Sequence, residues 1–236
     1  MKDALESLRT KSGTAFRIRV QSVAETPQNT EPASCPSDVE SLFEEDSRNG
    51  EITKPPLGAV IFPGSFNPPH RGHERMAKIA AMRLGKPVDW EISVANVDKP
   101  TLSADELQPR LNQLARLSLT PKVPTVTIWI TLAATFAEKA DIFKGATFIV
   151  GADTIRRIAD VRYYDDDPRK MSASIRRLVE DGSRFLVFGR FDLAPQSQVK
   201  EFQSLDGIAL PDELRAICDS VDESEFREDI ASRDLR

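Results

Sequence analysis

Cysteine and long apolar runs are scarce in this chain, and each scarcity excludes a class of protein. The 236 residues hold only two cysteines, Cys35 and Cys218. Two cysteines so far apart match neither a disulfide framework nor the ligand spacing of a zinc site. No apolar stretch approaches the roughly 18 residues that a membrane-spanning helix needs. The N-terminal MKDALESLRTK has early acidic residues and no apolar core, so it is not a secretory signal. We expect a protein of the reducing cytoplasm with no membrane partner.

Positive charge is also in deficit. The chain has 32 Lys and Arg against 37 Asp and Glu, a formal net charge of −5. This balance argues against nucleic acid as a partner, although a local basic pocket for a small phosphate ligand remains compatible with it. The length fits one sizeable domain with a tail. The oligomeric state stays open, a homo-oligomer included.

The composition changes near residue 55. A short strand is expected at 16–20, but residues 22–55 are rich in Pro, Ser, Thr, Asn, Asp and Glu and show no hydrophobic periodicity. Such a composition is typical of linkers and disordered segments. We therefore predict an N-terminal extension over 1–55, largely linker or disordered, and one folded domain over 56–236.

Strand and helix patterns alternate from Leu57 onward. Apolar runs without polar alternation predict strands at 59–62, 88–94, 125–130, 147–150 and 184–188. Amphipathic spacing predicts helices at 73–84, 103–117, 132–143, 168–181 and 212–219, with a short one after 151–154. Buried-type strands that are each followed by a helix predict an α/β fold, doubly wound, with a mainly parallel sheet of five to six strands.

Histidine is as rare as cysteine, and both histidines fall in one motif. His70 and His73 flank Gly72 in PGSFNPPHRGH, which follows the strand predicted at 59–62 and opens a helix. Glycine allows the backbone to approach a phosphate, and a helix N-terminus attracts anions. A strand, a glycine-bearing loop and a helix start therefore predict a phosphate site at the carboxyl edge of the sheet.

The run from Gly64 to Pro68, followed by His70 to His73, resembles the signature of the nucleotidyltransferase superfamily with the His-x-Gly-His motif. Within it the chain is most similar to nicotinamide or nicotinate mononucleotide adenylyltransferases. Three further segments carry this resemblance, which covers about 57–236: DKP at 98–100 followed by Arg110, GADT at 151–154, and the closing IASRDLR at 230–236. Four segments in the right order make a stronger signal than any one alone.

The resemblance implies that an acceptor phosphate oxygen attacks the α-phosphorus of a nucleoside triphosphate, with ATP favoured, and that pyrophosphate leaves. It assigns catalysis to His70, His73 and Lys99, and binding of the small phosphorylated acceptor to Lys99 and Arg110. It implies that Mg²⁺ is bound through the nucleotide phosphates. The residues that it assigns to the nucleotide are Gly64, Ser65, Phe66, Gly72, Gly151, Asp153, Ile230, Ser232, Arg233 and Arg236.

Two departures from the family pattern bear on the substrates. The tail has Ala231 and Arg233 where the family has hydroxyl residues, and the sequence stops at Arg236. The stretch after GADT has Tyr163 and Tyr164 but no tryptophan to stack on a pyridine ring. Transfer of a cytidylyl group, or a phosphopantetheine-type acceptor, therefore stays open, as does a nucleotide-binding module without turnover.

A second motif points to a different family. KMSAS at 170–174 is similar to the KMSKS loop of class I aminoacyl-tRNA synthetases, which also carry His-x-Gly-His. Here, however, it lies inside a helical pattern and before the fifth predicted strand, whereas the synthetase loop follows the last strand. The chain is also too short for an anticodon domain. We therefore favour the nucleotidyltransferase interpretation.

Overall fold

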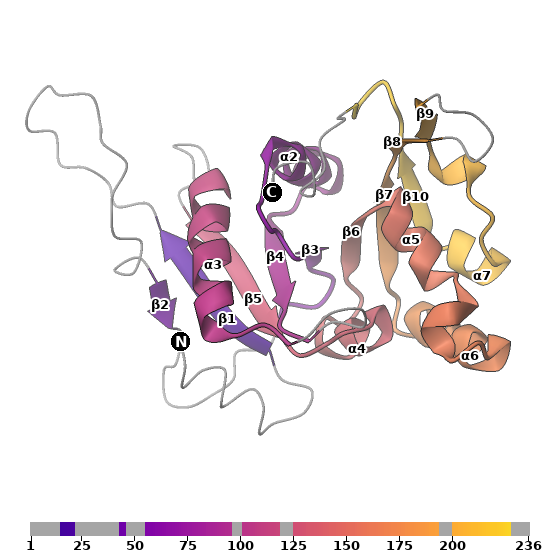
Figure 1. Cartoon of the computed structure of the whole chain (residues 1–236), viewed down its shortest axis with the longest axis horizontal. Helices are drawn as coiled ribbons and strands as arrows, with labels where there is room; N and C mark the ends of the chain where they lie inside the picture. Colours follow the sequence, from indigo (N-terminus) through magenta and orange to yellow (C-terminus); the bar gives the residue numbers. More distant parts are fainter. Residues whose placement is uncertain are drawn as a thin grey trace, which may run out of the picture.

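The centre of the molecule is one eight-stranded sheet (Figure 1). The structure is a computed structural model, and it describes residues 15–21, 43–45, 55–95, 101–118, 125–193 and 200–227. The strand order is β10-β7-β6-β3-β4-β5-β1-β2. The strands of this sheet are β1 (Ala15–Gln21), β2 (Phe43–Glu45), β3 (Val60–Pro63), β4 (Val88–Ser93), β5 (Thr125–Thr131), β6 (Thr147–Gly151), β7 (Arg184–Phe188) and β10 (Cys218–Val221). A separate two-stranded hairpin pairs β8 (Arg190–Leu193) with β9 (Lys200–Gln203).

The predicted α/β, doubly wound class is confirmed, but the predicted strand count is too low. The strands from β10 to β5 pair in parallel, and they match the five to six strands expected. Two more strands extend the sheet, because β1 pairs antiparallel with β5 and β2 pairs antiparallel with β1. Both come from the part of the chain that was predicted as an extension.

Helices cover both faces of the sheet. The helices are α2 (Arg71–Leu84), α3 (Ala104–Ser118), α4 (Phe136–Ile142), α5 (Ala152–Ile158), α6 (Pro168–Glu180) and α7 (Asp212–Arg215), with 3-10 turns at Val161–Tyr164 and Leu205–Gly207. One core cluster joins buried residues of α2 and α3, such as Ile79 and Leu111, to the sheet. A second cluster joins the other face to α4, α5, α6 and α7 through Ala140, Ile155 and Leu178. None of the described helices is long and apolar enough to cross a bilayer.

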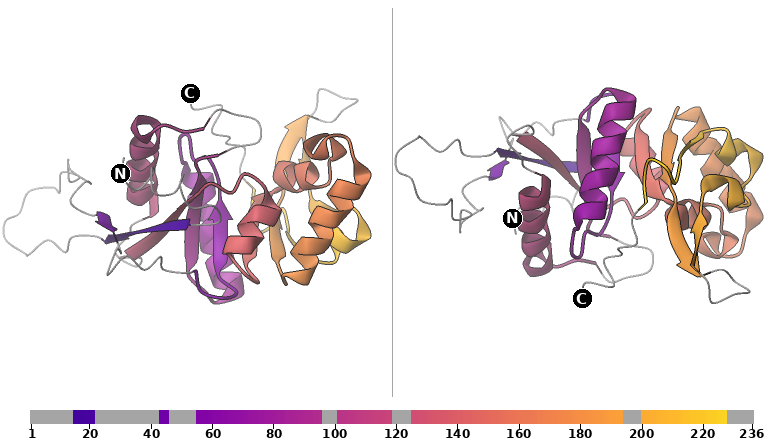
Figure 2. Two further views of the ribbon diagram at one scale, coloured as in Figure 1. Left: turned by 90° about the horizontal axis from the view of Figure 1, so that it is seen from below. Right: turned by 90° about the horizontal axis from the view of Figure 1, so that it is seen from above.

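The strand predicted at 16–20 exists and belongs to the sheet. Residue Ile18 lies opposite Ile128 of β5, and Arg17 lies opposite Trp129. Side chains of Ile18 and Val20 are buried in the same core cluster as α2 and α3. Figure 2 shows β1 beside β5 in two further views. The domain boundary at 55/56 stays a prediction, but Ala15–Gln21 packs as part of the same sheet.

Two predicted helices have the wrong ends. The helix expected over 132–143 begins only at Phe136, because Thr135 and Glu138 cap each other's backbone there. The helix expected over 212–219 stops at Arg215, and its second half is strand β10 beside β7. The β8–β9 hairpin was not predicted. The KMSAS segment does lie inside α6, before β7, as expected.

The order of the strands locates a binding edge. The chain runs from β3 to β4 and β5 on one side, then returns to β6, β7 and β10 on the other side of β3. In a parallel sheet of this kind the carboxyl ends at such a reversal are where ligands bind. The segments that leave β3, β4, β5 and β6 at this edge therefore hold the candidate site.

We expect Ile18→Ala to destabilise the protein by about 2–5 kcal/mol, as large-to-small substitutions in a core do. The side chain of Ile18 is 1% exposed between β5 and the helices. The midpoint of urea unfolding should fall at an unchanged m-value. The control is Leu57→Ala, since Leu57 is 82% exposed. An unchanged midpoint in Ile18→Ala would show that β1 is not part of the cooperative unit.

Candidate functional site

The loop after β3 is built around Phe66. The backbone of Phe66 has a φ of 41°, in the left-handed region that few residues other than glycine adopt. Its ring is buried and packs edge-on against Phe62, Trp90 and His73, with centroid distances of 5.5, 5.2 and 5.1 Å. The same ring covers Gly64, where a Cβ atom would lie 2.6 Å from it. Glycine at 64 is therefore required by the packing of Phe66.

The two histidines cap the first turn of α2 reciprocally. The Gly72 N–H donates to Nδ1 of His70 at 3.2 Å, and the His70 N–H donates to Nδ1 of His73 at 3.1 Å. The two imidazole centroids lie 3.8 Å apart. A neutral imidazole that accepts at Nδ1 carries its proton on Nε2. Both rings are thus set in the tautomer that donates from Nε2.

The environment of His73 keeps its imidazole neutral. Burial first, and the neighbouring His70 second, lower the pKa of His73 from 6.5 to about 3. A neutral His73 offers one N–H donor without adding a charge that would need solvation. That state is suited to hydrogen bonding with a phosphate oxygen across the physiological pH range.

Arg110 of α3 meets the same loop. Its guanidinium donates to the carbonyl of Ser65 at 3.2 Å, across 45 positions of sequence. The structure thus brings together five of the predicted site residues on the β3 side and adds Arg110 from α3. The five are Gly64, Ser65, Phe66, His70 and His73. Gly72, also predicted, is buried in the first turn of α2.

Gly151 and Asp153 lie at the carboxyl end of β6, the strand next to β3. Gly151 is the N-cap of α5, and a Cβ atom there would lie 2.9 Å from Oδ1 of Asp153. The other carboxylate oxygen lies 3.3 Å from the guanidinium of Arg190 on β8. Arg190 was not among the predicted site residues, because the hairpin that carries it was not predicted. This ion pair orients Asp153 at the sheet edge.

Several predicted site residues lie outside the described residues. They are Lys99, Ile230, Ser232, Arg233 and Arg236. The last described residues contact α2. Arg75 of α2 donates to the carbonyl of Glu225 at 3.2 Å and lies over the ring of Phe226. Their roles stay predictions.

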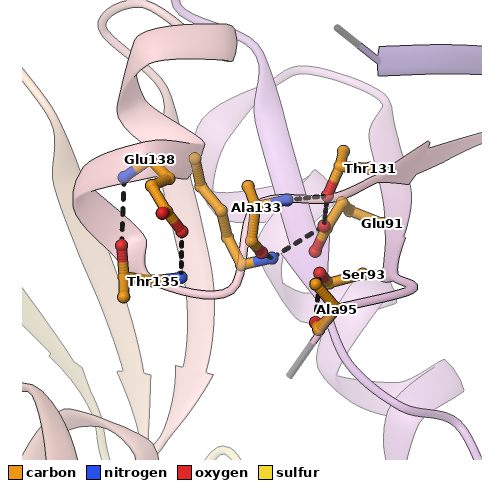
Figure 3. Close-up of polar contacts among 8 residues, drawn as sticks. Glu91, Ser93, Ala95, Thr131, Ala133, Thr135 and Glu138 are labelled. Carbon is orange, nitrogen blue, oxygen red and sulfur yellow. Dashed lines mark hydrogen bonds and ion pairs between the residues drawn. The ribbon is translucent and has the colours of Figure 1, made fainter. Parts of the chain in front are cut away.

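A buried polar cluster that local sequence patterns did not predict joins β4 to the end of β5 (Figure 3). Oε1 of Glu91 accepts from the hydroxyl of Thr131 at 2.6 Å and from Nζ of Lys139 at 2.7 Å. Lys139 also donates to the carbonyl of Ala133 at 2.9 Å. The available signals were a glutamate inside an apolar strand and a lysine on the buried side of α4.

The model of the cytidylyltransferase-like family matches residues 61–203, more than half of the chain. The match includes the histidine cap, the Glu91 cluster and Asp153. The chain belongs to the cytidylyltransferase-like family. The resemblance seen in the His-x-Gly-His signature is thereby confirmed.

Similar proteins carry adenylyltransferase names. A probable nicotinate-nucleotide adenylyltransferase from Mesorhizobium japonicum is 31% identical over 110 residues, which are 42% of this chain and 55% of that protein. A provisionally named nicotinamide mononucleotide adenylyltransferase from Schizosaccharomyces pombe is 28% identical over 122 residues, 49% of this chain and 47% of that protein. A probable nicotinate-nucleotide adenylyltransferase from Rhizobium leguminosarum is 39% identical over 67 residues, 27% of this chain and 33% of that protein. The matches span about half or less of these relatives.

We expect the His73 imidazole to stay neutral and protonated at Nε2 from pH 8 down to about pH 5, since its pKa is about 3. Nitrogen chemical shifts of the ring give both the charge and the tautomer. With only two histidines in the chain, His70→Asn assigns the signals. A midpoint for His73 above pH 5, or a proton on Nδ1, would contradict the reciprocal cap.

The lowered pKa of His73 also predicts that the free energy of unfolding declines as pH falls below about 6.5, where only the unfolded chain binds the proton.

Proposed function

We propose that this chain transfers AMP from ATP to nicotinate or nicotinamide mononucleotide and releases pyrophosphate. The observation that carries the proposal is the pair of histidines set as Nε2 donors at the start of α2, directly after β3. Family membership and the names of the relatives favour nucleotidyl transfer. The choice of a mononucleotide as acceptor rests on the names of these relatives.

In the proposed reaction a phosphate oxygen of the acceptor forms a bond to the α-phosphorus of ATP. The bond from that phosphorus to the bridging oxygen breaks, and pyrophosphate carries the electron pair away. Negative charge builds on the α-phosphate oxygens in the transition state. The Nε2–H of His73 donates there, and His70 donates to the phosphate chain. Catalysis of this kind rests on positioning and charge stabilisation.

Charged groups outside the helix start complete the proposed site. Asp153, oriented by Arg190, accepts from a ribose hydroxyl of the nucleotide. Lys99 and Arg110 serve the acceptor phosphate, while Ser232, Arg233 and Arg236 serve the β- and γ-phosphates. Among the described residues no three His, Cys, Asp or Glu side chains gather as metal ligands. Mg²⁺ bound to the phosphate oxygens of ATP would supply positive charge that offsets the negative charge on the leaving pyrophosphate.

A substrate screen tests the reaction. Purified protein with ATP, Mg²⁺ and either mononucleotide should form the dinucleotide and pyrophosphate in equal amounts, and EDTA should stop both. Turnover of CTP with a phospho-alcohol, and none with the mononucleotides, would show that the proposed acceptor and the proposed nucleotide are both wrong. ATP binding without acceptor-dependent pyrophosphate release would favour a binding module. Pyrophosphate exchange driven by an amino acid would favour a synthetase.

We expect His73→Ala to lower kcat by about 100- to 1000-fold, the usual loss when one donor to developing charge is removed. KM for ATP should change much less, because the donation strengthens in the transition state. The matched control is Lys78→Ala on the same helix, whose side chain is 60% exposed and pairs with Glu74 at the surface. Initial rates of pyrophosphate release measure both variants. A His73→Ala enzyme with nearly wild-type kcat would refute the catalytic role.

A further inference from the structure

Glu91 connects two loops at the carboxyl edge of the sheet. Its carbonyl accepts from the N–H of Gly64 at 3.0 Å, so its backbone holds the start of the loop that leads to the histidines. Its carboxylate binds the hydroxyl of Thr131 and the ammonium of Lys139, at the end of β5 and on α4. One residue of β4 thus fixes the exits of both neighbouring strands.

The side chains bound to Glu91 in turn shape the turn from β5 to α4. Thr131 Oγ1 accepts from the N–H of Ala133 at 3.2 Å while it donates to Glu91. Lys139 donates to the carbonyl of Ala133 at 2.9 Å. Both polar groups of the Ala133 backbone are therefore held by side chains that Glu91 orients (Figure 3).

The whole arrangement is buried. Glu91 and Thr131 are fully buried, and Lys139 is 5% exposed. The second carboxylate oxygen of Glu91 is buried and has no hydrogen-bond partner among the described residues. A well-packed apolar set of similar volume is often at least as stabilising as a buried ion pair. What the charged cluster adds is a fixed geometry for the backbone around it.

The cluster lies on one defined side of the proposed site. The strands β4 and β5 flank β3 on the side opposite to β6, whose end carries Asp153 of the proposed nucleotide half. Arg110, proposed for the acceptor, comes from α3, which connects β4 to β5. The turn held by Glu91 leaves the same carboxyl edge of the sheet, on the side of β3 away from β6.

We propose that Glu91, together with Lys139 and Thr131, is a positioning unit that sets the β5–α4 turn for acceptor binding. This inference rests on the proposed function for the identity of the reaction. Glu91 does not touch the reacting atoms in this scheme. It acts through the Ala133 backbone on the acceptor side and leaves the ATP side unchanged.

The test separates acceptor binding from ATP binding. Thr131→Val keeps the shape of the side chain but removes the hydroxyl that joins Glu91 to Ala133. We expect KM for the acceptor to rise about 10- to 100-fold, the scale of a small misplacement in a binding wall, with KM for ATP changed by no more than about twofold. Thr131→Ser restores the hydroxyl and should restore the acceptor KM.

A second pair of variants tests the carboxylate itself. Glu91→Gln should raise the acceptor KM as Thr131→Val does. The matched control is Asp89→Asn, since Asp89 lies two residues earlier on the same face of β4 and accepts from Trp129 at 2.9 Å, away from the turn. Where a single variant fails to fold, the double variant Glu91→Gln with Lys139→Met removes both charges and takes its place. Equal changes of the acceptor and ATP KM values, or none in either, would overturn the inference.

Hydrogen exchange separates this inference from the proposed function. The amide of Ala133 should exchange faster in Glu91→Gln and Thr131→Val than in wild type, Thr131→Ser or Asp89→Asn. If wild type shows no turnover with any acceptor, the proposed function fails, and exchange alone decides whether Glu91 positions the turn. Unchanged exchange at Ala133 would overturn the positioning role even in an active enzyme.

Discussion

The reciprocal capping of α2 by its own two histidines is the interaction on which the site depends. Nδ1 of each imidazole accepts a hydrogen bond from a backbone N–H at the start of the helix. At most helix N-termini the side chain that accepts from these N–H groups belongs to Ser, Thr, Asp or Asn. With histidine the cap also fixes ring orientation and tautomer, so the groups that hold the helix start are the same groups that we propose as donors to phosphate. Phe66, whose ring contacts His73 and covers Gly64, carries the constraint back to β3.

Buried charge on the opposite face shows a different use of polar groups. Removing one partner of a buried ion pair costs about 3–5 kcal/mol, because the other charge is left without compensation. Glu91 and Lys139 therefore depend on each other for stability, and the turn at Ala133 depends on both. The histidine cap fixes donors on side chains, whereas the Glu91 cluster fixes a stretch of backbone. Both sets of hydrogen bonds lie beside the carboxyl end of β3, and both are made within the chain itself.

Local patterns predicted the fold class well because most elements are defined by their own sequence. The apolar run at 184–188 and the capped helix at 168–180 are examples. Predictions failed where the partner decides: Cys218–Val221 is a strand because β7 lies beside it, not because of its own four residues. The histidine half of the site was visible as a motif. The pairing of Glu91 with Lys139 spans 48 positions and could not be read from either local pattern.

The antiparallel strand β1 has a consequence for the protein's behaviour at high concentration. The segment Thr125–Thr131, TVTIWIT, is uncharged, rich in β-branched residues and free of proline, which is the composition of segments that assemble between chains. Without Ala15–Gln21 it would form an open edge of the parallel sheet. β1 occupies that edge with Arg17 and Arg19 among its residues and leaves the three-residue β2 as the new border. Short, charged edge strands discourage edge-to-edge pairing, so we expect β1 and β2 to lower the tendency of the protein to aggregate through β5.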